Sequence, residues 1–465
     1  MNPDYLEFVK RKTRMDEPSG FDIEHGAIGF GGTPLKEFQR HIVKWALRRG
    51  RAAIFANTGL GKTAMQTTWA GHVAEHTGQP VLIAAPLCVA RQTQQEARKF
   101  GVHVEYVREM PADPHGVYVT NYEMLDEFEP EAFAGIVLDE SSILKNRDGK
   151  TRSRIINDWK HCPYRLSCTA TPSPNDYMEL GNQSEFLGIM GMDEMLAMFF
   201  THDGGDTSKW RLKGHGRKKF WQWLASWAVT IRLPSDLGFD DTGYILPMLH
   251  THEHLVTSQY GDDMFTSIAQ SLTERRQAKK ETLEERVAKV AEIVAKEPGE
   301  AWLIWCHTND EADMLRKSIP ESVEIRGSDH LLRKEDAING FLDGSVRVLI
   351  TKPSIAGMGL NLQHCARMAF VGLDDSFEQM YQAVRRCWRF GQEREVHSHI
   401  VSAESLGAIK QNVERKEMQM EAMQASMVEH MRDMMQKTVS AAGVEKTEYH
   451  PTVEMVIPDW IGEAA

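Results

Sequence analysis

The strongest constraint on the fold is the segment AAIFANTGLGKTA at residues 52–64, where a short apolar run leads directly into Gly-x-Gly-Lys-Thr. The apolar run predicts a buried strand, and the glycines predict a tight loop at the start of a helix. Glycines let successive backbone N–H groups point inward, and a helix N-terminus behind them adds a positive dipole end. The segment therefore predicts a phosphate-binding loop, with a simple glycine turn as the alternative.

Two side chains of this loop are suited to a nucleotide. Lys62 would reach the terminal phosphates, and the Thr63 hydroxyl would hold a magnesium ion. The strict form of such a loop opens on a glycine, whereas here Ala56 stands five residues before Gly61, so the match is relaxed. The choice between a phosphate loop and a plain turn therefore depends on the rest of the chain.

Short apolar runs that alternate with helical patterns predict an α/β fold. The runs are apolar on both faces, as expected for parallel strands that helices cover on two sides. They lie at residues 52–56, 81–86, 116–121, 135–140, 164–172, 301–306, 345–351, 367–372 and 395–402. Because 465 residues are too many for one ordinary core, two tandem lobes with parallel sheets fit this chain.

The region between the two sets of runs has a different texture, with Met- and Trp-rich helical patterns and a charged helix around TLEERVAKVAEIVAKE. We therefore expect a helical insert between the lobes and a helix after the second lobe. The expected boundaries are an N-terminal extension at 1–32, a nucleotide-binding first lobe at 33–177, a helical insert with a basic Gly-rich loop at 178–245, a second lobe at 246–405, and a C-terminal helix and tail at 406–465.

Composition limits the location and the partners of the chain. No run approaches the roughly 20 apolar residues of a membrane helix, and the N-terminus lacks a signal-peptide core. Six cysteines lie apart, without the spacing of a zinc site, so a reduced cytoplasm is the simplest expectation. The net charge of −12 means that any nucleic acid must be held in a local groove rather than by a global attraction.

Acidic and hydroxyl side chains follow two of the predicted strands. Asp139 and Glu140 end the run GIVLDE, where a carboxylate pair is costly unless a cation or water chemistry uses it. Asp139 would orient Mg²⁺ and Glu140 would polarise the water that attacks a γ-phosphate, with two solvated acids as the alternative. Thr169 and Thr171 end the next predicted strand, where their hydroxyls can bond to that acidic strand tip and to the other lobe.

Two arginines of the second lobe, Arg386 and Arg389 in QAVRRCWRFGQ, stand three residues apart on one predicted helical face. Arginines at this spacing can project together at a phosphate and stabilise its charge during phosphoryl transfer. A solvated basic face is the alternative for this segment taken alone. The order of the motifs along the chain decides between the two interpretations.

In that order, the motifs resemble those of superfamily 2 helicases and translocases, most closely the Swi/Snf-type branch, over about residues 33–402. LKEFQRHIVKWAL is similar to the adenine-reading segment, with Gln39 as its glutamine, and ANTGLGKT fits the Ala-headed phosphate loop of the superfamily. DESS stands in place of DEAH or DEAD, SCTATP in place of Ser-Ala-Thr, and SIAGMGLNL is similar to the fifth motif. QAVRRCWRFGQ follows Gln-Ala…Arg-x-x-Arg-x-Gly-Gln, the signature of the Swi/Snf-type branch.

The resemblance implies two tandem RecA-like lobes that close on ATP and Mg²⁺. It implies catalytic roles for Lys62, Asp139, Glu140, Arg386 and Arg389, ATP binding by Gln39, Thr58, Gly59, Gly61, Lys62 and Thr63, coupling by Thr169, Thr171, Gly359 and Gln382, and Mg²⁺ binding by Thr63 and Asp139. The chain departs from the family at Ser141 and Ser142, which replace the Ala-His pair that often links ATP to the second lobe. Its insert is shorter than that of large chromatin remodellers. The resemblance therefore implies a small bacterial or phage protein rather than a eukaryotic remodeller.

Three functions remain open on the sequence. The favoured one is a DNA-stimulated ATPase that translocates on duplex DNA, with or without strand separation. An RNA helicase or remodeller would use the same lobes, and an ATP-switched clamp would displace a protein and barely translocate. We expect a monomer in the cytoplasm of a bacterial or phage-infected cell, with nucleic acid as its partner and no membrane contact.

The segment SKWRLKGHGRKK carries a separate prediction. Its basic residues include Lys213, Arg217 and Lys218, and the glycines around them predict a mobile loop. We expect this loop to contact nucleic acid, with an ordinary solvated loop as the alternative. The aromatic residues that follow have helical spacing and predict core packing rather than base stacking: Phe220, Trp223 and Trp227.

A methionine stripe near the end of the chain predicts a long helix with one apolar face. Its members recur at spacings of three and four: Met420, Met423, Met427, Met431 and Met434. We expect this helix to pack back onto the second lobe. A surface that binds another protein is the alternative, because methionine side chains adapt to varied partners.

Overall fold

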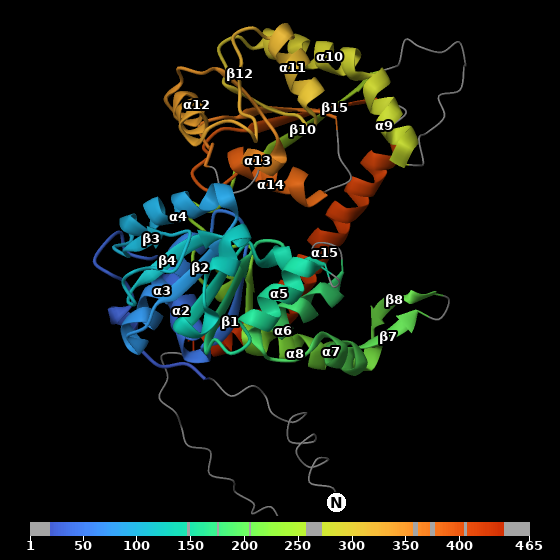
Figure 1. The fold of residues 1–465 in the computed structure, drawn as a ribbon. Helices are drawn as coiled ribbons and strands as arrows, with labels where there is room; N and C mark the ends of the chain where they lie inside the picture. Colours follow the sequence, from blue (N-terminus) through green and yellow to red (C-terminus); the bar gives the residue numbers. More distant parts are fainter. Residues whose placement is uncertain are drawn as a thin grey trace, which may run out of the picture.

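The computed structural model describes residues 19–146, 149–173, 176–203, 206–256, 272–356, 361–372, 377–403 and 407–440. Figure 1 shows two α/β lobes, one above the other, and the helix α15 (Gly407–Ser440), which runs from the second lobe onto the first. Within these ranges, none of the helices is both long and apolar enough to cross a membrane.

The first lobe is built on a seven-stranded sheet in the order β3-β4-β2-β5-β6-β1-β9, and every neighbouring pair in it is parallel. Its strands are β1 (Arg51–Ala56), β2 (Val81–Ala85), β3 (Val104–Tyr106), β4 (Val117–Asn121), β5 (Gly135–Asp139), β6 (Tyr164–Thr169) and β9 (Ala228–Ile231). Its main helices are α2 (Glu37–Arg49), α3 (Lys62–Thr77), α4 (Leu87–Lys99) and α5 (Lys150–Asp158). The strands β2, β4 and β5 are buried along their whole length, which explains why their sequences are apolar on both faces.

The second lobe has a six-stranded parallel sheet in the order β10-β15-β14-β11-β13-β12. Its strands are β10 (Leu249–Val256), β11 (Trp302–Trp305), β12 (Val323–Glu324), β13 (Val348–Thr351), β14 (Arg367–Val371) and β15 (Val396–Ala403). Its helices are α9 (Leu272–Glu281), α10 (Leu283–Lys296), α11 (Asn309–Ser318), α12 (Leu331–Asp343), α13 (Pro353–Ala356) and α14 (Phe377–Cys387). Local sequence fixes the start of α11, where the side chains of Thr308 and Glu311 each bond the other's backbone N–H.

These two sheets confirm the predicted architecture of tandem α/β lobes. Each of the predicted apolar runs coincides with a strand. Four strands of these two sheets were not predicted. β3 and β12 are too short to carry a pattern, and β9 lies in the expected insert. In β10, histidines stand at the alternate positions where apolar residues would indicate a strand.

The expected helical insert is part of the first lobe. It contains α6 (Leu180–Leu187), α7 (Met192–Phe199) and α8 (Arg217–Trp227), and then β9, which pairs with β1 at the edge of the first sheet. The segment expected as a loop is partly regular, because β7 (Phe200–Asp203) and β8 (Asp206–Leu212) form an antiparallel hairpin, which projects from the lobe in Figure 1.

The aromatic residues of α8 are core residues, as their spacing predicts. Phe220 and Trp227 are fully buried, and Trp223 packs against the same cluster. Their rings meet edge-on or tilted, with Trp223 and Trp227 centroids 5.2 Å apart. These side chains therefore hold α8 onto the first lobe.

The prediction that the C-terminal helix packs on the second lobe is wrong. The side chains of Met423, Met427, Met431 and Met435 are buried in the core of the first lobe, against α8 and β9. Gln424 Nε2 also donates a hydrogen bond to Ala170 O at 3.0 Å. The stripe therefore continues through Met435, whereas the side chains of Met420 and Met434 lie outside the described residues. A methionine period indicates that a face is buried, but it does not encode the surface that buries it.

This contact predicts a stability effect in the first lobe. Met431→Ala should lower the free energy of unfolding by about 2–5 kcal/mol, because it leaves a cavity where the side chain is fully buried. Met418→Ala on the same helix is the control, since 64% of Met418 is exposed and its removal should cost less than about 0.5 kcal/mol. Denaturant unfolding monitored by tryptophan fluorescence measures both. Equal effects of the two substitutions would contradict the observed packing.

Candidate active site

The predicted phosphate loop lies between β1 and α3, at the edge of the first lobe that faces the second. Gly59 and Gly61 have left-handed backbone conformations, with φ of 92° and 80°. A Cβ at Gly61 would lie 2.3 Å from Gln39 Nε2, and one at Gly59 would lie 3.0 Å from Phe390 Cβ of the second lobe. Only glycine fits these positions, both for conformation and for space.

Lys62, the first residue of α3, reaches back under the loop. Its Nζ donates a hydrogen bond to Ala56 O at 2.8 Å. Burial lowers the pKa of this ammonium, and the carboxylates of Glu140 and Asp139 act in the opposite direction. The Lys62 ammonium therefore lies close to the acidic strand tip and lines the cavity in which a phosphate would bind.

Gln39 lies beside the loop, near the start of α2. Its Oε1 accepts a hydrogen bond from Lys36 N, and its Nε2 donates one to Leu60 O, both at 2.9 Å. An amide has two donor hydrogens and two acceptor lone pairs, so one of each remains for another partner. The side chain thus braces the loop while it lines the same cavity as Thr58 and Thr63.

The acid pair, Asp139 and Glu140, lines the same cavity. Asp139 is the last residue of β5, and burial together with Glu140 raises the pKa of its carboxyl to about 7. Among the described residues, Glu140 alone of the non-glycine residues has a positive φ, at 55°. Thr169, at the end of the adjacent strand β6, donates its hydroxyl hydrogen to Glu140 Oε2 at 3.2 Å. Strain of this kind is held by surrounding contacts and is concentrated at functional sites.

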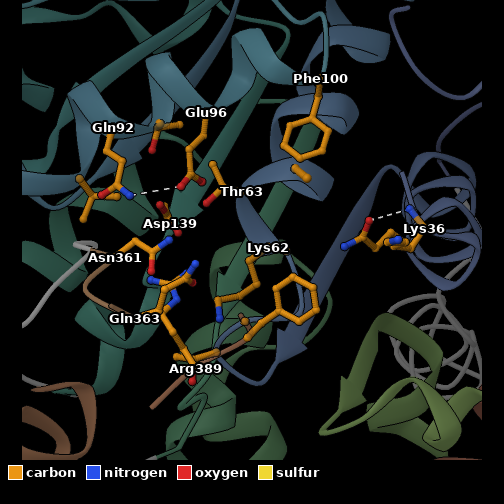
Figure 2. A pocket seen from close by; sticks show the side chains of 18 of the residues that line it. Lys36, Lys62, Thr63, Gln92, Glu96, Phe100, Asp139, Asn361, Gln363 and Arg389 are labelled. Atoms are coloured by element: carbon orange, nitrogen blue, oxygen red, sulfur yellow. Dashed lines mark hydrogen bonds between the residues drawn. The ribbon is translucent and has the colours of Figure 1, made fainter. Parts of the chain in front are cut away.

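These groups fit the magnesium ion that the motifs imply. A buried carboxyl with a raised pKa beside a second acid is unfavourable as a bare anion, and a divalent cation would compensate its charge. Hydroxyl and carboxylate oxygens are ligands that Mg²⁺ prefers. Thr63 and Asp139 line one cavity and lie near one another in Figure 2.

The second lobe contributes Arg386 and Arg389 to the same cavity. Arg386 lies in α14 and donates from Nε to its own-helix carbonyl Gln382 O at 2.9 Å. Arg389 lies beyond the end of α14, so the two arginines do not share one helical face as expected. Burial lowers the pKa of Arg389, whereas the carboxylate of Glu96 favours its charged form.

The cavity between the lobes has a volume of about 430 Å³, within the usual range for ligand pockets. Figure 2 shows side chains of both lobes around it. Several lining residues were not predicted: Lys36, Gln92, Glu96, Phe100, Tyr244, Asn361, Gln363 and Phe390. Of these, Phe390 lies inside the arginine motif and Gln363 lies just after the fifth motif, so motif proximity could have found them. Nothing in the sequence of α4 distinguishes Glu96 from a surface acid.

Helix α14 makes the contacts that join the lobes near this cavity. Glu378 pairs with Lys145, which follows the DESS segment, and lies 3.5 Å from the Thr171 hydroxyl. Tyr381 donates its hydroxyl hydrogen to Asn57 Oδ1 in the phosphate loop at 2.9 Å. Both connections start on the helix that carries Arg386 and Gln382. The predicted coupling residue Gly359 lies outside the described residues.

The predicted nucleic-acid residues lie elsewhere, and none of them lines the cavity. Lys213 follows β8 and donates from Nζ to Ala197 O at 2.7 Å, at the end of α7. Arg217 and Lys218 begin α8 and are exposed. Lys213 therefore differs from the other two residues: its ammonium bonds carbonyls at the end of α7, whereas Arg217 and Lys218 face solvent.

The comparisons with known proteins agree with the motifs. Residues 285–391 match the family described as Helicase conserved C-terminal domain. Protein p41 of Acyrthosiphon pisum secondary endosymbiont phage 1 is 23% identical over 451 residues, which covers 80% of this chain and 94% of that protein. Two lobes with this motif order and this family match resemble those of superfamily 2, the helicases and translocases.

Further relatives bear on the resemblance to the Swi/Snf-type branch. The SWI/SNF chromatin-remodeling complex subunit snf22 of Schizosaccharomyces pombe is 25% identical over 43% of this chain, and the chromatin-remodeling ATPase INO80 of Sclerotinia sclerotiorum is 26% identical over 38%. These matches confirm the resemblance to the Swi/Snf-type branch and support an ATP-hydrolysing, helicase-like enzyme. They span only 13% and 12% of those proteins. The Sulfolobus solfataricus SWI2/SNF2 ATPase core in complex with dsDNA aligns with 90% of this chain and 99% of its own, at 16% identity and a TM-score of 0.42.

Proposed function

We propose that this protein hydrolyses ATP between its lobes and uses their movement to translocate on duplex DNA. The observation that carries the proposal is the shared cavity. Lys62, Asp139 and Glu140 line it from the first lobe, and Arg386 and Arg389 line it from the second. A phosphate group bound there would be in contact with both lobes, so binding would favour closure and hydrolysis would release it.

In this proposal each residue has a separate task in phosphoryl transfer. Lys62 and the backbone N–H groups of the loop would bind the phosphates, and the two arginines would stabilise charge as the γ-phosphoryl group leaves. Glu140 would orient and deprotonate the attacking water, with its carboxylate held by Thr169. When bound by Thr63 and Asp139, Mg²⁺ supplies charge neutralisation at the phosphates.

The nucleotide base would occupy the aromatic side of the cavity. Phe100, Tyr244 and Phe390 line it, and the rings of Tyr244 and Phe390 lie 4.8 Å apart. Gln39 retains hydrogen-bonding capacity for an adenine edge, as the resemblance implies. These contacts support a proposal of ATP rather than of a simple phosphate ligand.

Coupling between the lobes would run through α14. Its Glu378 contacts Thr171 and Lys145, and its Tyr381 contacts the phosphate loop. A movement of the phosphate loop would therefore shift α14, the helix that also carries Arg386. This route would serve in place of the Ala-His pair that Ser141 and Ser142 replace.

Duplex DNA is the proposed track because the named relatives are chromatin-remodelling enzymes. Contacts would go mainly to phosphates, so sequence preference should be low. The phage relative supports the proposed location in a bacterial or phage-infected cell. A protein with a net charge of −12 needs a local basic surface for this, and the start of α8 offers one.

The exposed cations of α8 give a salt-dependence prediction. Arg217→Gln/Lys218→Gln should reduce the slope of log K against log salt for DNA binding by about 2, since each lost phosphate contact contributes about 0.9. Lys213→Gln is the control: it should lower stability and leave the slope unchanged, because its ammonium binds α7 carbonyls. Fluorescence anisotropy over a salt series measures the slopes. An unchanged slope in the double variant would assign these cations to the ordinary solvated surface.

The nature of the track is tested by ATPase stimulation. We expect duplex DNA to raise ATP turnover more than single-stranded DNA or RNA does. Greater stimulation by RNA would favour an RNA remodeller, and absence of stimulation by any nucleic acid would favour an ATP-switched clamp. A matched Lys62→Ala protein, which should not turn over ATP, excludes contaminating ATPases.

A further inference from the structure

Five histidines form a continuous row on one face of the second sheet. His250, His252 and His254 alternate along the edge strand β10, and His397 and His399 alternate along its neighbour β15. In the parallel register, His250 is paired with His397 and His252 with His399. Alternate residues of a strand point to the same face, so these imidazoles lie together. We call this row the histidine ladder.

The rings of the histidine ladder contact one another directly. The planes of His252 and His397 differ by 3°, and His252 Nε2 lies 2.9 Å from His397 Nδ1. At one end of the row, His250 Nε2 lies 3.0 Å from Oε2 of Glu395, the residue that precedes β15. A row of stacked, mutually bonded imidazoles requires that most of them stay neutral, because adjacent imidazolium ions would repel one another.

The histidine ladder lies beside charged groups of neighbouring elements. The charged groups that act on the ladder are Lys289, Glu292 and Lys296 of α10, Arg367 of β14, and Glu297, which pairs with Arg367 at 2.6 Å. A neutral imidazole keeps a lone pair on one ring nitrogen, and this is the form that binds metal ions.

The geometry points to a site for a divalent transition metal of the Zn²⁺ class, held by His250, Glu395 and His397. One ligand atom of each of these residues lies within 4.8 Å of the others. Two imidazoles and a carboxylate are an established ligand set for Zn²⁺, which binds such atoms at about 2.0–2.2 Å. Small rotations of the side chains would bring the three atoms onto one ion. Glu395 is exposed, so solvent gives the ion a path to the site.

His252 would position one of these ligands. Because Nδ1 of His397 is engaged by His252, its other ring nitrogen is the one left for a metal ion. A ligand imidazole whose second nitrogen is hydrogen-bonded has its ring plane fixed, which strengthens metal binding. The cysteine spacing of the chain indicates no zinc site, but this site uses residues that are far apart in the sequence and adjacent only in the sheet.

The site does not depend on the proposed ATPase function. None of its three residues lines the cavity between the lobes. A bound ion would instead join the edge strand β10 to the segment that follows the arginine motif, since Glu395 stands six residues after Arg389. Metal binding should therefore raise the unfolding temperature, because an ion that binds only the folded chain stabilises it.

The test uses Co²⁺ as a spectroscopic probe, followed by displacement with Zn²⁺. A second group, His25, Glu37 and His41 on the first lobe, also meets the same distance condition, so the experiment is done in a His41→Gln background. We expect about one Co²⁺ per chain, with the visible absorption of a four- or five-coordinate ion, and full displacement by Zn²⁺. His397→Gln and Glu395→Gln should each weaken Co²⁺ binding by at least about tenfold. Because Glu395 is exposed, its substitution should leave the fold intact.

His254→Gln is the matched control, because it makes the same substitution in the ladder outside the three ligands. It should keep both the affinity for Co²⁺ and the spectrum. Circular dichroism and basal ATP turnover in the presence of Mg²⁺ establish that each variant is folded. Failure of the parent protein to bind Co²⁺ would overturn the proposal, as would equal binding by Glu395→Gln, His397→Gln and His254→Gln.

Discussion

Glu140→Gln is expected to lower the turnover of ATP by about 10²–10⁴-fold while ATP still binds, because the amide cannot accept a proton from the attacking water. Glu140 stands at the tip of β5 in a strained conformation and is held there by Thr169. The substitution keeps the shape of the side chain and its bond to that hydroxyl. Steady-state ATPase assays give the turnover, and titration with a fluorescent ATP analogue gives the affinity.

Glu96→Gln is the control for this experiment. Glu96 lines the same cavity, but from α4 and without a strained backbone, so its loss should change turnover by less than about tenfold. Lys62→Ala provides the opposite case to Glu140→Gln, because it should weaken the binding of ATP itself. Near-normal turnover by Glu140→Gln would remove that residue from the catalytic role.

The arginines of the second lobe carry the second large effect. Arg386→Ala and Arg389→Ala should each lower turnover by about 10³-fold with little change in nucleotide affinity, because charge on the phosphoryl oxygens is greatest during transfer. Both variants are measured at saturating ATP and nucleic acid, so that weakened binding does not mimic slow chemistry.

Arg385→Ala provides the matched control for the arginines. Arg385 is a neighbour on α14, but its guanidinium lies over the ring of Trp388, at 4.3 Å from the centroid, and does not line the cavity. We expect its loss to reduce turnover by less than about tenfold. If either cavity arginine behaves like Arg385, that residue does not act on the transferred phosphoryl group.

Much of the fold could be predicted from the sequence because parallel strands covered on both faces must be apolar throughout, as β2 and β5 are. The positions of Lys62, just after the loop that follows β1, and of Asp139, at the end of β5, followed from the same pattern. The histidine-rich strand β10 could not be recognised, since its half-buried face carries three polar residues, His250, His252 and His254.

Long-range packing accounts for most of the remaining errors. An amphipathic period predicts a buried face in α15 but contains no information on which lobe buries it. Glu378 was missed for a related reason. Its role depends on Lys145, and these residues come together only when the lobes meet, because they lie 233 positions apart in the sequence.

The position of α15 also determines the order in which the chain can fold during synthesis. Every strand of the first sheet lies before residue 232, yet Met423, Met427 and Met431 complete the core of that lobe. The N-terminal lobe therefore leaves the ribosome first and reaches its final packing last, after the whole second lobe has been made. A nascent or truncated chain that ends before residue 423 exposes the apolar surface of α8 and β9, so a chaperone would encounter this protein at that surface.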